Sequence, residues 1–346
     1  MMLHRIFICA VAALASTTAL AQAPAGGDFY KGKTITVITS TGAGGTYDLV
    51  ARLVARYMPK YVPGSPAMIV QNMPGGGNVL ATNFMYTIAP KDGTSIATIH
   101  NAMPLHQALG GQGVRFDAGK FNWLGSTGAD NEVIIAWHTS DVKTIEDAMK
   151  KELVLGGTGA GSGIVIFPTA MNNVLGTKFK IVIGYKSSED VNLAIQRGEV
   201  QGRAFSMGSI VSQHGDWLTE KKVSFLVQLG EKRDHAMPDV PLATELARND
   251  EERGILKLVS APQALGQPYL APPDVPQDRV AVLRKGFMAA LQDKDFLADA
   301  ARSKFDIDPI DGEEIARIVR GTLSESPEVV AKAKAAMDTS SLSGAR

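Results

Sequence analysis

Cysteine is almost missing from this chain of 346 residues, which has a single one, Cys9. Internal disulfides are therefore excluded, and the fold has to be stabilised by packing alone. An excess of either charge is missing too, because 35 basic residues balance 35 acidic ones. This balance argues against nucleic acid or an anionic membrane as the main partner. Beyond the N-terminal segment, no apolar run reaches the roughly 18 residues that a membrane-spanning helix needs.

The first 21 residues have the pattern of a secretory signal peptide. His4 and Arg5 precede an apolar run, and small residues follow at Ala19 and Ala21. This order of basic, apolar and small residues predicts cleavage after Ala21. We therefore expect a mature protein that is exported to the periplasm without its only cysteine.

The remaining chain alternates between short β-branched strands and helices with one apolar face. Strands are expected at 34–40, 67–71 and 94–100, with glycine turns and helices between them. The same order recurs over 129–227, and such an alternation is typical of parallel α/β sheets. Because roughly 300 residues exceed what one core usually organises, two lobes are expected. The sequence predicts an α/β protein in which each lobe is a mainly parallel sheet flanked by helices, with two strands crossing between the lobes.

The two lobes are expected to interleave along the chain. The first takes residues 28–128 and 228–346, and the second takes residues 129–227. The stretch "VSFLVQLG" is interpreted as the strand that leads the chain back to the first lobe.

Two glycine turns join a strand to a helix, "STGAGGTYD" in the first lobe and "GGTGAGSG" in the second. Glycine lets backbone amides approach a ligand because no Cβ intervenes. The first amides of the following helix are unpaired and lie at the positive end of its dipole, where a carboxylate or phosphate binds. Two such turns across a cleft would suit a molecule with two acidic ends, or one acid group held from both sides. The competing interpretation is that each turn is only a tight connection.

Nucleotide cofactors do not fit these turns. Gly157, Gly159 and Gly161 alternate instead of following the dinucleotide-binding spacing, and the acidic residue expected about 20 positions later has no clear counterpart. The phosphate-binding pattern of nucleotide triphosphatases is also missing. We therefore expect no cofactor.

Four polar residues near the first turn have two interpretations each. Asp48 is either a carboxylate that the helix dipole stabilises, which is the simpler interpretation, or a ligand contact. Thr46 either caps the helix or turns its hydroxyl to the ligand. His100 and Asn101 end a strand beside the presumed cleft, where a lone histidine is more often a structural hydrogen-bond partner than a ligand contact.

Two residues of the second lobe are further candidates. Tyr185 ends a strand, so its hydroxyl can point into a cleft from a rigid base. Arg203 stands in the otherwise uncharged stretch "VQGRAF". It either pairs with Glu199 or holds a ligand carboxylate through two hydrogen bonds.

No catalytic set emerges from the chain. None of the histidines has metal-ligand spacing with a second histidine or a cysteine. The G-x-S-x-G elbow of a serine hydrolase is also missing. We expect neither enzymatic activity nor a bound metal.

Five stretches resemble, in their order, the TctC or Bug family, the extracytoplasmic solute receptors of the tripartite tricarboxylate transporter system. The first two are "YKGKTITVITSTGAGGTYDLVARLVARYM" and "VQNMPGGGNVLATNFMYTIAPKDGTSIATIH". "GGTGAGSG", "IVIGYKSSEDVNLAIQRGEVQGRAF" and "MPDVPLATEL" follow, so the resemblance covers nearly the whole mature chain. It implies a two-lobed, Venus-flytrap periplasmic binding protein that closes over a small organic acid and delivers it to the permease subunits in the membrane. We expect this receptor to be a monomer.

The resemblance also implies a binding site. Family members hold a carboxylate on backbone amides of both glycine turns, partly through water. Here that role falls on the Thr41–Tyr47 and Thr158–Ser162 turns, and Tyr185 takes the place of the cleft-facing tyrosine. The full set of expected ligand-binding residues is Thr41, Gly44, Gly45, Thr46, Tyr47, Asn78, His100, Asn101, Thr158, Gly159, Ala160, Gly161, Ser162, Tyr185 and Arg203.

The chain departs from the family pattern in ways that bear on the ligand. Thr41 and Gly184 stand where the family usually has prolines. Gln201 replaces an aspartate, and Arg203 follows two residues later. Losing an acid and gaining a guanidinium favours extra negative charge on the ligand, so the sequence predicts a dicarboxylate or an aromatic carboxylate.

Two other functions remain open at this point. A solute receptor that feeds a membrane sensor kinase would use the same closed surface as a transport receptor. A periplasmic hydrolase is the third alternative, and product formation would distinguish it.

Overall fold

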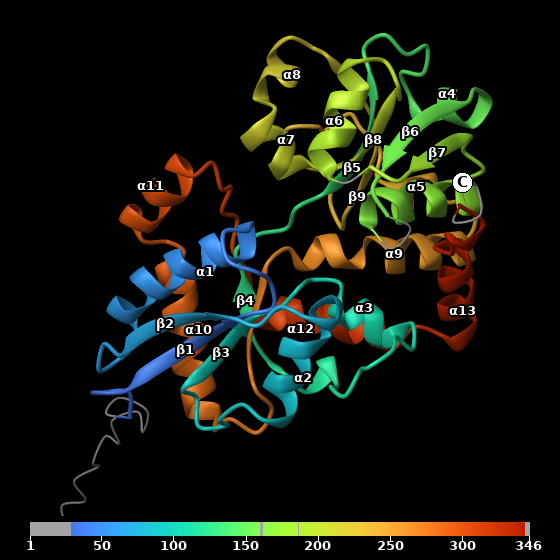
Figure 1. The fold of residues 1–346 in the computed structure, drawn as a ribbon. Helices are drawn as coiled ribbons and strands as arrows, with labels where there is room; N and C mark the ends of the chain where they lie inside the picture. The colour runs from blue at the N-terminus through green and yellow to red at the C-terminus, as the bar shows by residue number, and fades with distance from the viewer. Residues whose placement is uncertain (1–28, 160–161, 186, 343–346) are drawn as a thin grey trace, which may run out of the picture.

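The structure, a computed structural model, describes residues 29–159, 162–185 and 187–342. The expected signal peptide and two expected site residues, Ala160 and Gly161, lie outside these ranges. Figure 1 shows two α/β lobes, each with a sheet flanked by helices, as the sequence predicts. No helix in the described ranges is long and apolar enough to cross a membrane.

The first lobe is built on a six-stranded sheet. Its strands are β1 (Thr34–Thr39), β2 (Ala67–Asn72), β3 (Ser95–Thr98), β4 (Asn122–Ser126), β10 (Pro268–Ala271) and β11 (Ile310–Asp311). They lie in the order β11-β4-β10-β3-β1-β2. The β-branched β1 lies between β3 and the edge strand β2. Its side chains alternate between two cores: Ile35 and Val37 enter one, and Ile38 enters the other.

Helices cover both faces of this sheet. The core that contains Val37 also contains side chains of α1 (Thr46–Tyr57), α10 (Gln277–Ala290) and α11 (Lys294–Arg302). The opposite core is closed by α2 (Val79–Thr87), α3 (Met103–Ala108) and α12 (Gly312–Leu323). Because helices cover both faces, all four residues of β3 and the last three of β1 are buried.

The second lobe is built on a five-stranded sheet with one joint core. Its strands are β5 (Glu132–Trp137), β6 (Leu153–Gly157), β7 (Phe179–Ile183), β8 (Gly202–Ser206) and β9 (Val223–Leu229), in the order β7-β6-β8-β5-β9. Its helices are α4 (Ile145–Lys150), α5 (Gly163–Leu175), α6 (Ser188–Gln196), α7 (Met207–Gln213) and α8 (Gly215–Thr219). Ser187 caps α6 by accepting the amide of Asp190, as the sequence pattern predicts.

Both sheets are mixed, which corrects the expectation of mainly parallel sheets. The strands joined by helical crossovers are parallel: β1 with β2 and β3, and β6 with β7 and β8. The strands β5 and β10 run antiparallel to their neighbours. Each of these two enters its sheet from the other lobe, at the edge where the parallel strands end, so it has to run in the opposite direction.

Two C-terminal helices pack differently from the expected division of the chain, which gives residues 228–346 to the first lobe. The helix α9 (Asp250–Leu265) runs between the lobes (Figure 1) and contributes Leu256 to the core of the second sheet and Leu265 to that of the first. The helix α13 (Pro327–Ala336) contributes Ala333 to the core of the second sheet. The carbonyl of Ala336 accepts the side-chain amide of Asn173 at 2.9 Å. We propose a division in which α9 bridges the lobes and α13 belongs to the second.

Candidate functional site

The buried carboxylate of Asp48 stabilises the first glycine turn by accepting a backbone hydrogen bond from it. This side chain is 2% exposed, and its Oδ2 accepts the Gly44 amide at 2.8 Å. Its Oδ1 lies 2.9 Å from the guanidinium of Arg52. Hydrogen bonding to Arg52 lowers the pKa of Asp48 to about 2, with the Gly44 amide contributing. Asp48 therefore stabilises the turn and the first helical turn of α1, in line with the simpler of its two interpretations, and its carboxylate is already occupied by partners within the protein.

The start of α1 presents free amides. Gly45 is the N-cap residue, and no side chain caps this helix end. In the described part of the chain, no partner accepts the amides of Gly45, Thr46 or Tyr47. Gly45 and Thr46 are exposed, so these donors are open to an anion at the positive end of the helix dipole.

The Tyr47 side chain fastens the turn to its surroundings. Its hydroxyl donates to the carbonyl of Gly266 at 3.1 Å and accepts the amide of Asn101 at 3.2 Å. The ring of His100 stacks on that of Tyr47 with 5.7 Å between centroids. Burial lowers the pKa of His100, so this imidazole is neutral at pH 7. The turn thus offers amide donors and no charged histidine.

Two further expected residues lie at the same sheet edge. The hydroxyls of Thr41 and Thr39 are 3.1 Å apart, and the Thr41 carbonyl accepts the side-chain amide of Asn72. Asn78 follows β2 and has a left-handed backbone with φ of 74°. Within the described ranges, its side chain forms no hydrogen bond, so it is free to contact a ligand.

The second glycine turn repeats the open helix end. Ser162 is the N-cap residue of α5, but its hydroxyl donates to the carbonyl of Gly159 at 2.7 Å instead of capping the helix. The same hydroxyl accepts a hydrogen bond from Thr158 at 3.0 Å. The amides of Gly163 and Ile164 have no partner among the residues that the structure describes. Sequence reasoning placed this anion site on the turn itself and did not name these two amides.

Tyr185 lies beside the second turn, two residues after the end of β7. Its amide donates to the carbonyl of Gly157 at 3.4 Å, and the amide of Gly184 donates to that of Thr158 at 2.9 Å. The ring is partly buried, which raises the pKa of the phenol. Its hydroxyl has no hydrogen-bond partner in the described part of the chain. It is therefore available to a ligand as a donor.

The guanidinium of Arg203 forms hydrogen bonds within the protein, which differs from the expected contact with a ligand. The residue is only 4% exposed, and its Nη1 donates to the carbonyl of Ser188 at 2.8 Å and to Oδ1 of Asn192 at 2.7 Å. These bonds fasten α6 to β8, because a buried guanidinium needs acceptors inside the fold. The alternative partner, Glu199, lies 3.9 Å from Arg197 instead.

Two acidic residues at the connection between β4 and β5 were missed by sequence reasoning. Asp130 accepts the hydroxyl of Ser206 at 2.6 Å and the amide of Gly208 at 3.0 Å. Burial raises the pKa of Glu132 to about 8, and the negative charge of Asp130 adds to this effect. The only sequence signal is the pair of acidic side chains directly before the apolar run in "ADNEVIIAW".

Replacing Glu132 by glutamine is expected to stabilise the protein at high pH. The carboxyl has an ordinary pKa of 4.5 and a folded-state pKa of about 8, so the folded protein binds the extra proton between these values. Stability is therefore lost as the pH rises through this window, and glutamine avoids that loss. We expect Glu132→Gln to raise the free energy of unfolding by roughly 2 kcal/mol at pH 9 and by much less at pH 4. Urea unfolding at both pH values measures the difference, and an equal effect at both would contradict the raised pKa.

The expected residues form two groups, one on each sheet. Thr41, Asn78 and His100 follow β1, β2 and β3, which are neighbours in the first sheet. Thr158 and Tyr185 follow the neighbouring strands β6 and β7 of the second. Each group contains a helix N-terminus with open amides, an arrangement that can bind carboxylates without a cation. Within the described ranges, no cluster of three or more His, Cys, Asp or Glu side chains is placed to hold a metal.

The chain is similar to proteins of one family. The family model described as "Tripartite tricarboxylate transporter family receptor" matches residues 50–334. A TctC solute binding protein from Polaromonas, solved without ligand, has a TM-score of 0.70 at 17% identity, covering 89% of this chain and 99% of that one. MatC from Rhodopseudomonas palustris, with bound malate, has a TM-score of 0.57 at 21% identity, covering 88% and 99%. A protein from R. palustris with adipate has a TM-score of 0.59 at 16% identity, covering 87% and 97%. The chain belongs to the family of tripartite tricarboxylate transporter receptors.

Proposed function

We propose that this protein is a periplasmic receptor that captures a small dicarboxylate between its lobes and delivers it to the permease subunits of a tripartite tricarboxylate transporter. One observation carries the proposal: two helices, α1 and α5, each begin at a glycine turn, and their first amides have no partner among the residues that the structure describes. Helix N-termini of this kind bind carboxylates. Closure of the lobes would bring both turns onto one ligand.

The ligand class follows from these two helix ends. Each can take one carboxylate, so a molecule with an acid group at both ends uses both. Relatives of the same fold with bound malate and adipate support this choice. The buried Arg203 lends no support to extra charge on the ligand, so the argument rests on the amides alone. An aromatic carboxylate is the second candidate, because the free hydroxyl of Tyr185 and its ring lie beside one helix end.

A thermal-shift screen of the mature protein tests the proposal. The compounds are dicarboxylates of four to eight carbons, citrate, and aromatic acids with one or two carboxylates. A ligand at 100 times its dissociation constant adds about 2.7 kcal/mol to the stability of the folded protein, which is a shift of several degrees. We expect a dicarboxylate to raise the melting temperature most. We also expect it to be recovered unchanged, because a receptor binds its ligand without converting it. The proposal is contradicted if the protein, cleared of co-purified ligand, shows no thermal shift with any of the acids. It is also contradicted if the protein converts the acid to a product.

A single substitution tests the role of the α1 amides. Thr46→Pro removes one unpaired amide, and proline is tolerated at the first position of a helix. We expect the dicarboxylate affinity to fall about tenfold or more, since a hydrogen bond to a charged group contributes about 1.5–3 kcal/mol. Thr46→Ala is the matched control, because it loses the hydroxyl and keeps the amide. Calorimetric titration of both variants compares them. Equal affinities in Thr46→Pro and the wild type would show that this amide does not hold the ligand.

A further inference from the structure

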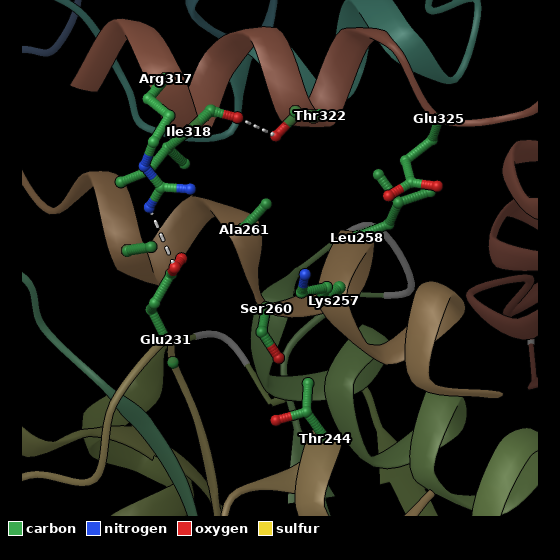
Figure 2. Close-up of a pocket in the computed structure, with 13 residues that line it drawn as sticks. Glu231, Thr244, Lys257, Leu258, Ser260, Ala261, Arg317, Ile318, Thr322 and Glu325 are labelled. Atoms are coloured by element: carbon green, nitrogen blue, oxygen red, sulfur yellow. Dashed lines mark hydrogen bonds and ion pairs between the residues drawn. The ribbon is translucent and has the colours of Figure 1, made fainter. Parts of the chain in front are cut away.

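A cavity of about 150 Å³ lies between α9 and α12 (Figure 2), and none of its lining residues belongs to either glycine turn. Its walls come from both lobes. Gly230 and Glu231 follow β9 of the second sheet, and α12 packs against β4 of the first. An engineered cavity of about this size holds one benzene molecule, so the cavity has room for roughly six non-hydrogen atoms.

The inner wall of the cavity combines apolar groups with one unsatisfied hydroxyl. Leu258 and Ala264 are buried, and Ala261 and Ile318 complete an apolar surface. Ser260 is 4% exposed, and its Oγ has no hydrogen-bond partner within residues 29–159, 162–185 and 187–342. A buried hydroxyl without a partner costs about 1–3 kcal/mol, so the site is suited to a bound group that bonds to it.

One basic and one acidic side chain at the rim of the cavity, Lys257 and Glu325, form no ion pair within the part of the chain that the structure describes. Arg317 is neutralised by Glu314 at 2.6 Å and Glu231 at 3.2 Å. Lys257 and Glu325 also line the cavity, and neither side chain forms an ion pair or hydrogen bond with another residue that the structure describes. In Figure 2, Lys257 lies beside Ser260 on the lower side of the cavity, and Glu325 reaches toward the cavity from above, just after the end of α12.

We propose that this cavity binds a small zwitterion, an α-amino acid with a short aliphatic side chain. Its carboxylate pairs with Lys257 and accepts the Ser260 hydroxyl, and its ammonium group pairs with Glu325. Its aliphatic part covers Ala261 and Ala264. A simple carboxylate would leave Glu325 unpaired, and a simple amine would leave Lys257 unpaired. Room for roughly six non-hydrogen atoms fits alanine best, and valine, with about two more, is the largest amino acid that we expect to bind.

Calorimetric titration of the mature protein tests this site. The probes are alanine and valine, with propionate, isobutyrate and isobutylamine as analogues that carry one charge. We expect the two amino acids to bind at least about tenfold more tightly than the analogues, because each charge-assisted hydrogen bond contributes about that factor. Failure of both amino acids to bind, or equal binding of propionate, would overturn the proposal.

Matched variants locate the binding. Lys257→Gln and Glu325→Gln should each weaken amino-acid binding about tenfold or more. Lys294→Gln and Glu313→Gln, which remove the same charges from exposed positions outside the cavity, should leave it unchanged. Ser260→Ala should weaken binding without destabilising the fold, since its hydroxyl has no partner to lose.

The Thr46→Pro variant separates this site from the dicarboxylate site. Amino-acid binding that survives in Thr46→Pro and is lost in Glu325→Gln supports a second site, whether or not the protein binds dicarboxylates. Amino-acid binding that is lost in Thr46→Pro and unchanged in Glu325→Gln places the amino acid at the glycine turns and refutes the cavity site.

Discussion

Replacing Gly266 by alanine is expected to destabilise the protein by about 4 kcal/mol or more. The residue ends α9 with φ of 55° and ψ of −116°, a conformation that residues with a Cβ rarely adopt. A methyl group here would overlap the backbone carbonyl oxygen of Gly128, and its carbonyl carbon would lie at 2.6 Å. Neither backbone segment can turn away as a side chain could, because Gly128 lies between β4 and β5, where the chain crosses between the lobes, and Gly266 lies between α9 and β10.

The matched control for this prediction is Gly198→Ala. Gly198 also has a positive φ, of 74°, but an added Cβ would have no atom within 4 Å. This control should cost only about 1 kcal/mol, the strain of the left-handed backbone. Urea unfolding of both variants measures the difference, which isolates the overlap with Gly128. Values for the two variants that agree within about 1 kcal/mol would show that the connection relaxes around the added methyl.

Replacing Arg203 by alanine is expected to cost about 3 kcal/mol or more in stability. The change removes the guanidinium donor from the buried carbonyl of Ala204, from the buried Oδ1 of Asn192 and from the partly buried carbonyl of Ser188. The guanidinium also lies 4.0 Å from the centroid of the Phe205 ring, and that packing is lost as well. Burial lowers the pKa of Arg203 to about 10, so the side chain is still charged at neutral pH, and its bonds are charge-assisted.

Arg197→Ala is the control for Arg203→Ala. Arg197 is exposed, with its carboxylate partner at 3.9 Å, and its loss should change stability by about 0.5 kcal/mol or less. Urea unfolding gives the stability of both variants, and dicarboxylate titration of the folded protein gives the affinity. We expect Arg203→Ala to lose stability while the folded fraction binds its ligand within a few-fold of the wild type. A variant that keeps its stability and loses its ligand would restore Arg203 as a binding residue.

The elements around both glycine turns could be predicted because their signals are local. The first turn follows the β-branched strand β1, and α1 begins directly after Gly45. The second turn follows β6, and α5 begins directly after Ser162. The family and the two-lobed fold are confirmed, since they depend on the order of these elements along the chain. The structural role of Asp48 could also be predicted, because the Gly44 amide and the Arg52 guanidinium that bind its carboxylate are four residues away in the sequence.

Predictions that needed distant partners were less accurate. The isolated arginine in "VQGRAF" suggested a ligand contact, yet its acceptors come from α6, which the sequence could not place against β8. The strand directions in both sheets depend on where the chain re-enters each lobe. The docking of α13 on the second lobe likewise has no local signal.

The sequence by itself determined the order of strands and helices, the two helix ends with open amides, and the membership of a receptor family. These properties follow from backbone preferences and spacing over a few residues. Only the tertiary structure decided that Arg203 is buried, that Glu132 has a raised pKa, and that Lys257 and Glu325 line one cavity between α9 and α12. Burial and desolvation depend on which distant segments pack together, and packing between the lobes is a property of the whole chain.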